Sequence, residues 1–198
     1  MTRIVAINGS PNQAGNTATL LQAILQHIPP AQAETHLLHA AAIVTASGEP
    51  FCTVCGTPCP GVCYAGTPLE EAYALLQQAD AILLGSPVYF GTVSAPIKAF
   101  FDKSRKLRAG KALLNKVGAA VAVGAARFGG QETTLRALHD IMLVHGMILV
   151  GDGDRSTNCG HHGVAAQAPA GNDHYAHSSA AALAARITAV AQATQTLR

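Results

Sequence analysis

A short polar run near the start of the sequence, Asn8-Gly-Ser-Pro-Asn-Gln-Ala-Gly-Asn-Thr17, is suited to binding a phosphate. It follows an apolar segment over residues 3–7 and precedes a helical pattern over residues 20–28. Between a strand and a helix, such a run directs free backbone N–H groups and the positive helix end to one point, where a phosphate can bind. Side-chain hydroxyls and amides add further donors. The phosphate-binding residues that we expect are Ser10, Asn12, Asn16, Thr17 and Ala18.

This run differs from the two common nucleotide-binding loops. It does not contain the dinucleotide fingerprint G-x-G-x-x-G. Compared with a Walker loop it has one extra residue, and Asn16 stands in place of the lysine. An ordinary capped turn between a strand and a helix is the alternative interpretation, because polar caps are common.

A second chemical feature is a dense group of cysteines. Four of the five cysteines lie within 12 residues, as Cys52-x2-Cys55-x3-Cys59-x3-Cys63. Converging thiolates on a backbone rich in glycine and proline fit an iron–sulfur cluster. Zinc also binds four thiolates, although zinc ribbons usually separate two C-x2-C pairs by about 15–20 residues. The residues alone leave an iron–sulfur cluster, zinc and free thiols open.

Composition limits the classes of function. Of the 198 residues 49% are hydrophobic and 12% charged, which is enough for a core and indicates a covered subunit surface as well. The net charge of +2 is too small to indicate a nucleic acid or anionic membrane partner. Apolar runs are interrupted well before about 18 residues, and the first residues lack the order of a signal peptide. We therefore expect a cytoplasmic homodimer or homotetramer that binds neither nucleic acid nor membrane.

Strand and helix patterns alternate along the chain. The apolar segments predict strands at residues 3–8, 34–39, 80–85, 117–124 and 147–151, with helices at 16–28, 68–79, 93–106, 131–145 and 174–196. This alternation predicts the α/β class, with a doubly wound five-stranded parallel sheet in the flavodoxin-like order 2-1-3-4-5. We expect a single domain over residues 1–198, with a Cys-rich loop excursion at about 40–67.

Three loops leave the carboxyl ends of the predicted strands, where ligands bind in such sheets. The first covers residues 9–16. In the second, glycine allows close backbone approach and aromatic rings supply stacking surface, at Pro87, Val88, Tyr89, Phe90 and Gly91. In the third, backbone N–H groups can bond the carbonyl edge of a ring and an arginine can meet a phosphate-bearing substrate, at Gly124, Arg127, Gly129 and Gly130. Inward packing of the aromatic rings and a plain surface role for Arg127 are the alternatives.

The three loops carry motifs that occur in order over about residues 3–151. They are Gly9-Ser-Pro-Asn…Gly15-Asn-Thr17, Gly85-Ser-Pro-Val-Tyr-Phe-Gly91…Ser94-Ala-Pro-Ile-Lys-Ala-Phe-Phe-Asp102 and Gly129-Gly-Gln-Glu-Thr-Thr134…His145-Gly-Met147. Together they resemble the NADPH-dependent FMN reductase family of flavodoxin-like flavoproteins. The resemblance implies FMN, with its phosphate on the first loop and its ring against the other two, and NAD(P)H as co-substrate. It implies no protein acid or base, because the flavin itself exchanges hydride.

The Cys-rich segment resembles the cysteine cluster of the iron–sulfur flavoproteins, a branch of the same family. That branch pairs FMN with a 4Fe–4S cluster, which implies Cys52, Cys55, Cys59 and Cys63 as ligands. The middle spacing is three residues here, where the branch usually has two.

The leading hypothesis is an FMN-dependent oxidoreductase. It would pass electrons from NAD(P)H or an iron–sulfur donor to a small acceptor, such as a quinone, a nitro or azo compound, a metal ion or free flavin. The alternatives are an iron–sulfur flavoprotein acting as an electron-transfer carrier and a metal-binding sensor. Flavodoxin-type carriers are typically acidic, whereas this chain is mildly basic.

Histidines near the end of the sequence suggest a metal site less strongly. His161 and His162 follow Cys159, but adjacent residues of a regular element do not readily face one centre. We expect residues 158–167 to form a loop that covers a neighbouring subunit's flavin or binds substrate. His139 and His145 fall on a predicted helix and are expected to be structural.

Overall fold

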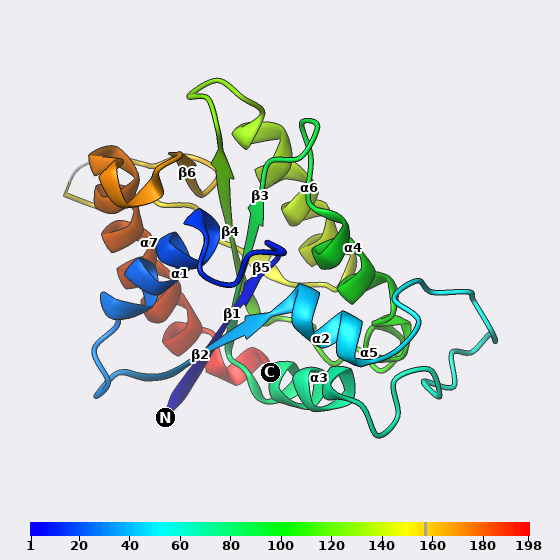
Figure 1. Ribbon diagram of the computed structural model, residues 1–198. Helices are drawn as coiled ribbons and strands as arrows, with labels where there is room; N and C mark the ends of the chain where they lie inside the picture. The colour runs from blue at the N-terminus through cyan, green and yellow to red at the C-terminus, as the bar shows by residue number, and fades with distance from the viewer. Residues whose placement is uncertain (157) are drawn as a thin grey trace.

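A twisted parallel sheet forms the centre of the computed structural model, which describes residues 1–156 and 158–198 (Figure 1). Its strands follow the spatial order β2-β1-β3-β4-β5, and each neighbouring pair is parallel. The predicted fold class and strand order are therefore confirmed. The strands are β1 (Thr2–Asn8), β2 (Ala33–His39), β3 (Ala81–Pro87), β4 (Val117–Gly124) and β5 (Ile148–Leu149).

Two separate segments share the fifth position of the sheet. β5 pairs only with the start of β4, where Ile148 lies opposite Val117. The rest of β4 pairs with β6 (Val164–Gln167), so that Gln167 lies opposite Gly124. The sequence predicted one strand over residues 147–151 and a loop over 158–167, and the second of these predictions is wrong for residues 164–167. A four-residue segment with two alanines is too short to show a strand period.

Helices cover both faces of the sheet, and strand residues alternate between two cores (Figure 1). Ile4 and Leu83 face the helices α1 (Asn16–Gln26) and α7 (His174–Ala193). Val5 and Leu84 face the opposite layer. That layer consists of α2 (Ala40–Ala46), α3 (Pro68–Gln78), α4 (Ala95–Asp102), α5 (Arg105–Ala109) and α6 (Gln131–Val144). Two 3-10 turns, η1 (Ala170–Asn172) and η2 (Gln195–Leu197), flank α7.

Several helix predictions need correction at their ends. Residues 40–46, predicted as loop, form α2, which spans too few residues to show a helical period in the sequence. The helix predicted over 93–106 is two helices, because Ser104 Oγ donates to Phe101 O at 2.6 Å and replaces a helical bond. The last helix ends at Ala193 rather than at residue 196. No helix within residues 1–156 and 158–198 has the length and apolar character needed to cross a membrane.

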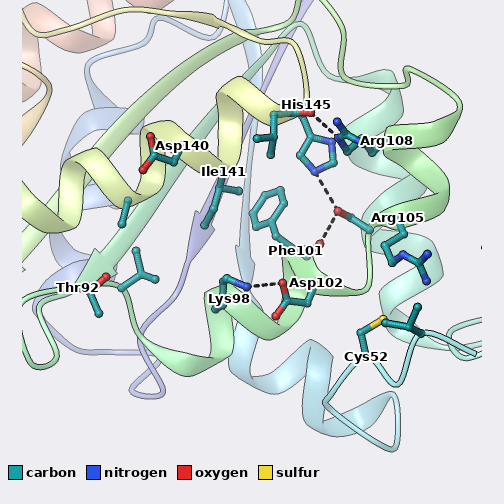
Figure 2. Close-up of a pocket in the computed structure, with 15 residues that line it drawn as sticks. Cys52, Thr92, Lys98, Phe101, Asp102, Arg105, Arg108, Asp140, Ile141 and His145 are labelled. Atoms are coloured by element: carbon teal, nitrogen blue, oxygen red, sulfur yellow. Dashed lines mark hydrogen bonds and ion pairs between the residues drawn. The ribbon is translucent and has the colours of Figure 1, made fainter.

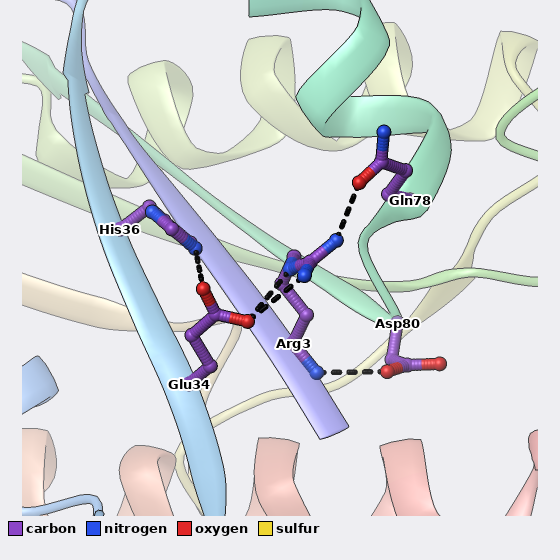
Figure 3. A network of polar contacts seen from close by, with 5 residues as sticks. All are labelled: Arg3, Glu34, His36, Gln78 and Asp80. Carbon is purple, nitrogen blue, oxygen red and sulfur yellow. Dashed lines mark hydrogen bonds and ion pairs between the residues drawn. The ribbon is translucent and has the colours of Figure 1, made fainter. Parts of the chain in front are cut away.

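A charged network fastens the amino-terminal edge of the sheet (Figure 3). The Arg3 guanidinium donates to Glu34 Oε2 at 2.9 and 3.0 Å and to Gln78 Oε1 at 2.7 Å. The backbone N–H of Arg3 donates to Asp80 Oδ2 at 2.8 Å. Hydrogen bonds from Arg3 lower the pKa of the Glu34 carboxyl, which also contacts His36. These charges join β1, β2 and the end of α3, at the edge opposite the three predicted loops.

A row of rings attaches the Cys-rich segment to this framework. Tyr64, Tyr73, Phe100, Phe101 and His145 contact one another edge to face, with centroids 4.9 to 5.7 Å apart. Tyr73 Oη donates to Phe100 O at 2.5 Å, and burial raises the pKa of this phenol well above its usual value. Because Tyr64 ends the Cys-rich segment, the row fixes that segment against α3 and α4.

Candidate functional site

The first loop rests on the backbone of β3. Gly9 N–H donates to Gly85 O at 2.7 Å, and Ser94 Oγ donates to Gly9 O at 2.5 Å. A Cβ added to Gly9 would lie 2.8 Å from Gly85 O, closer than real side chains approach. A glycine at position 9 therefore lets the loop cross the carboxyl end of β3, at the point where the strand order reverses.

Side chains of the loop hold its turn in place. Asn8 Oδ1 accepts from Ser10 N–H at 3.0 Å, and Ser10 Oγ accepts from Asn12 N–H at 3.1 Å. Asn12 Oδ1 then accepts from Ala14 N–H at 3.0 Å. Each short polar side chain thus bonds the backbone two residues further on, the usual behaviour of such residues in turns.

The amino end of α1 presents free donors. The helix begins after Gly15 and has no side-chain cap. In the part of the chain that the structure describes, no acceptor contacts the backbone N–H groups of Asn16, Thr17 and Ala18. Asn16 Oδ1 accepts from Ala170 N–H at 2.9 Å, which leaves its amide N–H groups as donors. This end of the helix is able to bind an anion.

The second loop is a tight two-residue turn at the tip of a short ladder. Tyr89 and Thr92 exchange backbone hydrogen bonds of 3.0 and 3.2 Å, and Phe90 and Gly91 between them have φ of 50° and 77°. A left-handed conformation is uncommon for a bulky residue, and such outliers gather at functional sites. The Phe90 side chain is fully exposed, so its ring is available to a ligand or a partner.

The second and third loops contact each other directly. Thr133 Oγ1 donates to Gly91 O at 2.6 Å, and Val88 N–H donates to Val123 O at 2.9 Å. Gly130 has φ of 100°, and a Cβ there would lie 3.0 Å from Gly91 Cα. The two loops therefore form one continuous wall at the carboxyl edge.

The buried Gln131 side chain shapes the third loop. Its Oε1 accepts from Gly129 N–H at 2.9 Å, and its Nε2 donates to Ala126 O at 2.5 Å. The Gly129 N–H is thus already paired, contrary to its expected role as a donor to a ring. Gly124 packs against the same amide, where a Cβ would lie 2.5 Å from Gln131 Nε2.

Asp173 also belongs to this edge. Its carboxylate accepts from Gln167 N–H at 2.9 Å and from Ala176 N–H at 3.1 Å, and so joins β6 to α7. Burial opposes ionisation, but these N–H donors and the nearby Arg127 lower the pKa of Asp173 overall. Arg127 itself is exposed.

The cofactor residues predicted from the three loops follow the carboxyl ends of β1, β3 and β4, and the contacts above link the first loop to β3 and the second loop to the third. The sequence analysis gave no role to four buried or hydrogen-bonded residues that hold these loops in place, namely Asn8, Ser94, Gln131 and Asp173. Asn8 and Gln131 lie within the loop motifs and Ser94 lies at a predicted helix start, so the sequence carried a signal for these three. For Asp173 the signal was no more than a polar residue before a helix.

The four clustered cysteines lie elsewhere, on a segment that projects beside α5 (Figure 1). All four line one cavity of about 200 Å3, together with Lys103 and Arg105. Burial raises the pKa of the Cys63 thiol, Lys103 lowers it, and the other three thiols raise it. Among the described residues, no three His, Cys, Asp or Glu side chains are grouped so as to hold a single metal ion.

A larger cavity of about 640 Å3 lies between α4, α5 and α6, with Cys52 on its border (Figure 2). His145 forms part of its wall and is 7% exposed. Ser104 Oγ donates to Phe101 O, so it accepts from His145 Nε2, 3.0 Å away. Burial and then Arg108 lower the pKa of His145. The ring joins α6 to the start of α5, the structural role expected for it.

His161 and His162 border a third cavity of about 440 Å3 with Asp152 and Tyr175. His161 Nδ1 lies 3.3 Å from Tyr175 Oη. The His162 ring contacts that of His139 edge to face, with centroids 6.1 Å apart. This cavity lies beside β6 and the start of α6, and the covering or substrate role of residues 158–167 stays a prediction.

Comparison with known proteins identifies the family. Residues 2–162 match the family described as NADPH-dependent FMN reductase. The chain belongs to this family. The protein is accordingly an FMN-dependent NAD(P)H oxidoreductase, as the resemblance of its three loops implied.

Relatives of this protein carry different names. It is 42% identical over 164 residues to an iron-sulfur flavoprotein of Methanocaldococcus jannaschii, which covers 82% of each chain. It is 45% identical over 76 residues to an NAD(P)H dehydrogenase (quinone) of Trichlorobacter lovleyi, covering 38% of this chain and 37% of that one. The WrbA-like flavodoxin of Agrobacterium tumefaciens superimposes with a TM-score of 0.70 at 22% identity, covering 98% and 100% of the two chains, which shows a shared fold.

His145→Gln should make the stability of the protein less sensitive to acid. The pKa of His145 is lowered in the folded state, whereas in the unfolded chain it is about 6.5. Below that pH the unfolded state binds more protons, so the free energy of unfolding falls until the pH reaches the folded pKa. Glutamine can still bond Ser104 but does not titrate.

Denaturant unfolding at pH 7.5 and pH 5.5 measures this effect. Wild type should lose more stability on acidification than His145→Gln, while the exposed His27→Gln should behave as wild type. An equal loss for wild type and His145→Gln would show that this imidazole is not responsible.

Proposed function

We propose that FMN lies along the carboxyl edge of the sheet, with its phosphate at the amino end of α1. The observation that carries this proposal is the set of unpaired N–H groups at Asn16, Thr17 and Ala18 beside a loop that glycine keeps close to β3. A dianion at this point would satisfy donors that the protein itself leaves free. The residues present therefore fit the cofactor that the family uses.

Side chains of the first loop would complete the phosphate site. Ser10 Oγ accepts from Asn12 N–H and still has its own hydrogen to donate. The amide of Asn16 is free to donate because its oxygen is bonded to Ala170. Thr17 is buried, and its hydroxyl has no partner in residues 1–156 and 158–198. Asn12 supports the turn through its own oxygen.

The second and third loops would hold the ring. Exposed aromatic groups and backbone form one wall, at Pro87, Val88, Tyr89, Phe90 and Gly91. The other wall is Gly124, Arg127, Gly129 and Gly130, where the N–H of Gly130 rather than that of Gly129 is free to donate. Bound FMN supplies hydride exchange, and the loops supply placement and exclude water from the ring.

We further propose that Cys52, Cys55, Cys59 and Cys63 hold a 4Fe–4S cluster. All four thiols surround one cavity, and the other three raise the pKa of the Cys63 thiol, which fits a shared centre. A thiolate set is the usual ligand set of such a cluster, and a 42% identical relative is named an iron-sulfur flavoprotein. The cluster would supply one-electron transfer. Zinc would use the same thiolates, and the measured zinc and sulfide contents distinguish it from a cluster.

With both groups in place, we propose that electrons pass from NAD(P)H or an iron–sulfur donor to a small acceptor. The relative named NAD(P)H dehydrogenase (quinone) supports a quinone as that acceptor. The Cys-rich segment projects beside α5, and exposed rings stand at the loop tips on Phe90 and Phe128. We therefore also propose a homodimer or homotetramer, in which these surfaces meet a second copy.

The protein loaded with FMN should oxidise NADPH or NADH continuously when a soluble quinone is supplied. Absorbance of the reduced nicotinamide measures the rate, and a sample without FMN is the control. A single stoichiometric reduction without turnover, together with fast exchange with a reduced iron–sulfur protein, would instead favour an iron–sulfur flavoprotein that acts as a carrier.

Thr17→Val should weaken FMN binding without affecting riboflavin. A hydrogen bond to a charged group contributes about 1.5–3 kcal/mol, so the Kd for FMN should rise about ten- to 100-fold. Riboflavin lacks the phosphate and serves as the internal control in the same fluorescence titration. An equal loss for both ligands would place Thr17 at the ring or in the fold, not at the phosphate.

Cys59→Ser should lose iron and acid-labile sulfide while it retains FMN, because a 4Fe–4S cluster needs four thiolates. Cys159→Ser removes an exposed thiol outside the cluster and should keep both. Iron, sulfide, zinc and flavin are quantified per chain after anaerobic purification. Zinc without sulfide in wild type, lost in Cys59→Ser, would replace the cluster with a zinc site.

A further inference from the structure

Lys103 is a buried cation for which the structure supplies no carboxylate partner. It follows the last turn of α4 and is 2% exposed. Its Nζ donates to Glu49 O, a neutral acceptor. No carboxylate within residues 1–156 and 158–198 forms an ion pair with it. The Glu49 carboxylate borders the same cavity but accepts from Phe51 N–H at 3.1 Å.

This arrangement is costly unless an anion lies close by. A buried ammonium loses its hydration, and hydrogen bonds to carbonyl oxygen replace only part of it. The other buried lysine shows the contrast: Lys116 donates to Gln77 O at 2.9 Å and Ala79 O at 2.5 Å, and it also has the Asp80 carboxylate nearby. At Lys103 the carboxylate bordering the cavity is that of Glu49, which bonds Phe51 N–H instead.

Apart from the Glu49 carboxylate, which bonds Phe51 N–H, the groups around this cavity that can carry negative charge are thiols. Lys103 lines the 200 Å3 cavity with all four cysteines of the Cys-rich segment. Arg105 lines it as well, but it is half-buried and donates to Gly56 O at 3.2 Å and Thr57 Oγ1 at 3.3 Å. Arg105 thus holds the backbone of the segment, whereas Lys103 brings a full positive charge to the inside of the cavity.

We propose that Lys103 is the counter-charge of the cluster held by Cys52, Cys55, Cys59 and Cys63, and that it raises the reduction potential of that cluster. The inference rests on the proposed cluster. Four thiolates give the centre a net negative charge, and one added electron makes it more negative. A fixed cation beside the centre stabilises the reduced form more than the oxidised form.

Lys103→Met tests this role in the full chain reconstituted with FMN, iron and sulfide. The substitution keeps an apolar stem and removes the charge. In an anaerobic redox titration followed by the electron paramagnetic resonance of the reduced cluster, one electron from the titrant reduces each centre. At a fixed ambient potential, the ratio of oxidised to reduced cluster should rise about tenfold, a midpoint lower by about 59 mV for a one-electron couple.

Lys98→Met is the matched control. It lies on the same helix and removes the same charge, but Lys98 is exposed, pairs with Asp102 at 2.5 Å and does not line the cavity of the cysteines. Its midpoint should equal that of wild type. A Lys103→Met midpoint equal to that of wild type, or an equal shift in both variants, would overturn the role of Lys103.

A second measurement applies if Lys103→Met does not assemble a cluster. In iron-free protein the buried ammonium lacks its counter-charge, so Lys103→Met should unfold at the same or a higher denaturant concentration than iron-free wild type. Unfolding at a lower concentration would show that Lys103 serves the fold itself and would overturn the proposal. If wild type takes up no iron and sulfide on reconstitution, the proposed cluster itself is wrong. That failure is distinct from an unchanged midpoint, which would overturn only the role of Lys103.

Discussion

The carboxyl edge of this sheet depends on a backbone contact between Gly9 and Gly85. After the parallel strands β1 and β3 the chain turns to opposite faces of the sheet, which creates a crevice. The first loop crosses this crevice at Gly9, where a side chain would not fit. The 2.7 Å hydrogen bond between the two glycines fixes where α1 begins, and Ser94 Oγ strengthens the contact by donating to Gly9 O. Because the free N–H groups of α1 follow directly, this contact sets the position of the proposed phosphate site.

Helix α4 connects the two centres proposed above. Its amino end follows the turn at Phe90 and Gly91, and its carboxyl end leads to Lys103 at the cavity of the cysteines. Eight residues of helix therefore fix the wall formed by the second and third loops relative to the base of the Cys-rich segment. The row of rings from Tyr64 to His145 packs against the same helix and adds to this rigidity.

The two proposed centres differ in their electrostatics. At the carboxyl edge the donors are neutral backbone and amide groups, which suits a cofactor whose phosphate keeps a constant charge during the reaction. At the Cys-rich segment full charges lie in and around a small cavity, which suits a centre whose charge changes with each electron. A fixed cation inside such a cavity acts on the energy of that change rather than on binding alone.

The sequence by itself determined the sheet order, the three loops at its carboxyl edge and the density of thiols. Continuous apolar runs such as Val117–Val123 and glycine-rich turns after them follow from local chemistry. Tertiary structure alone decided the split fifth strand, the pairing of Gly129 N–H with Gln131 and the burial of Lys103. The split strand and the burial of Lys103 depend on contacts between residues distant in the chain, and the bond of Gly129 depends on the direction in which the Gln131 side chain points. Neither spacing nor composition encodes these. A lysine after a helix looks like a surface residue until the packing around it excludes water.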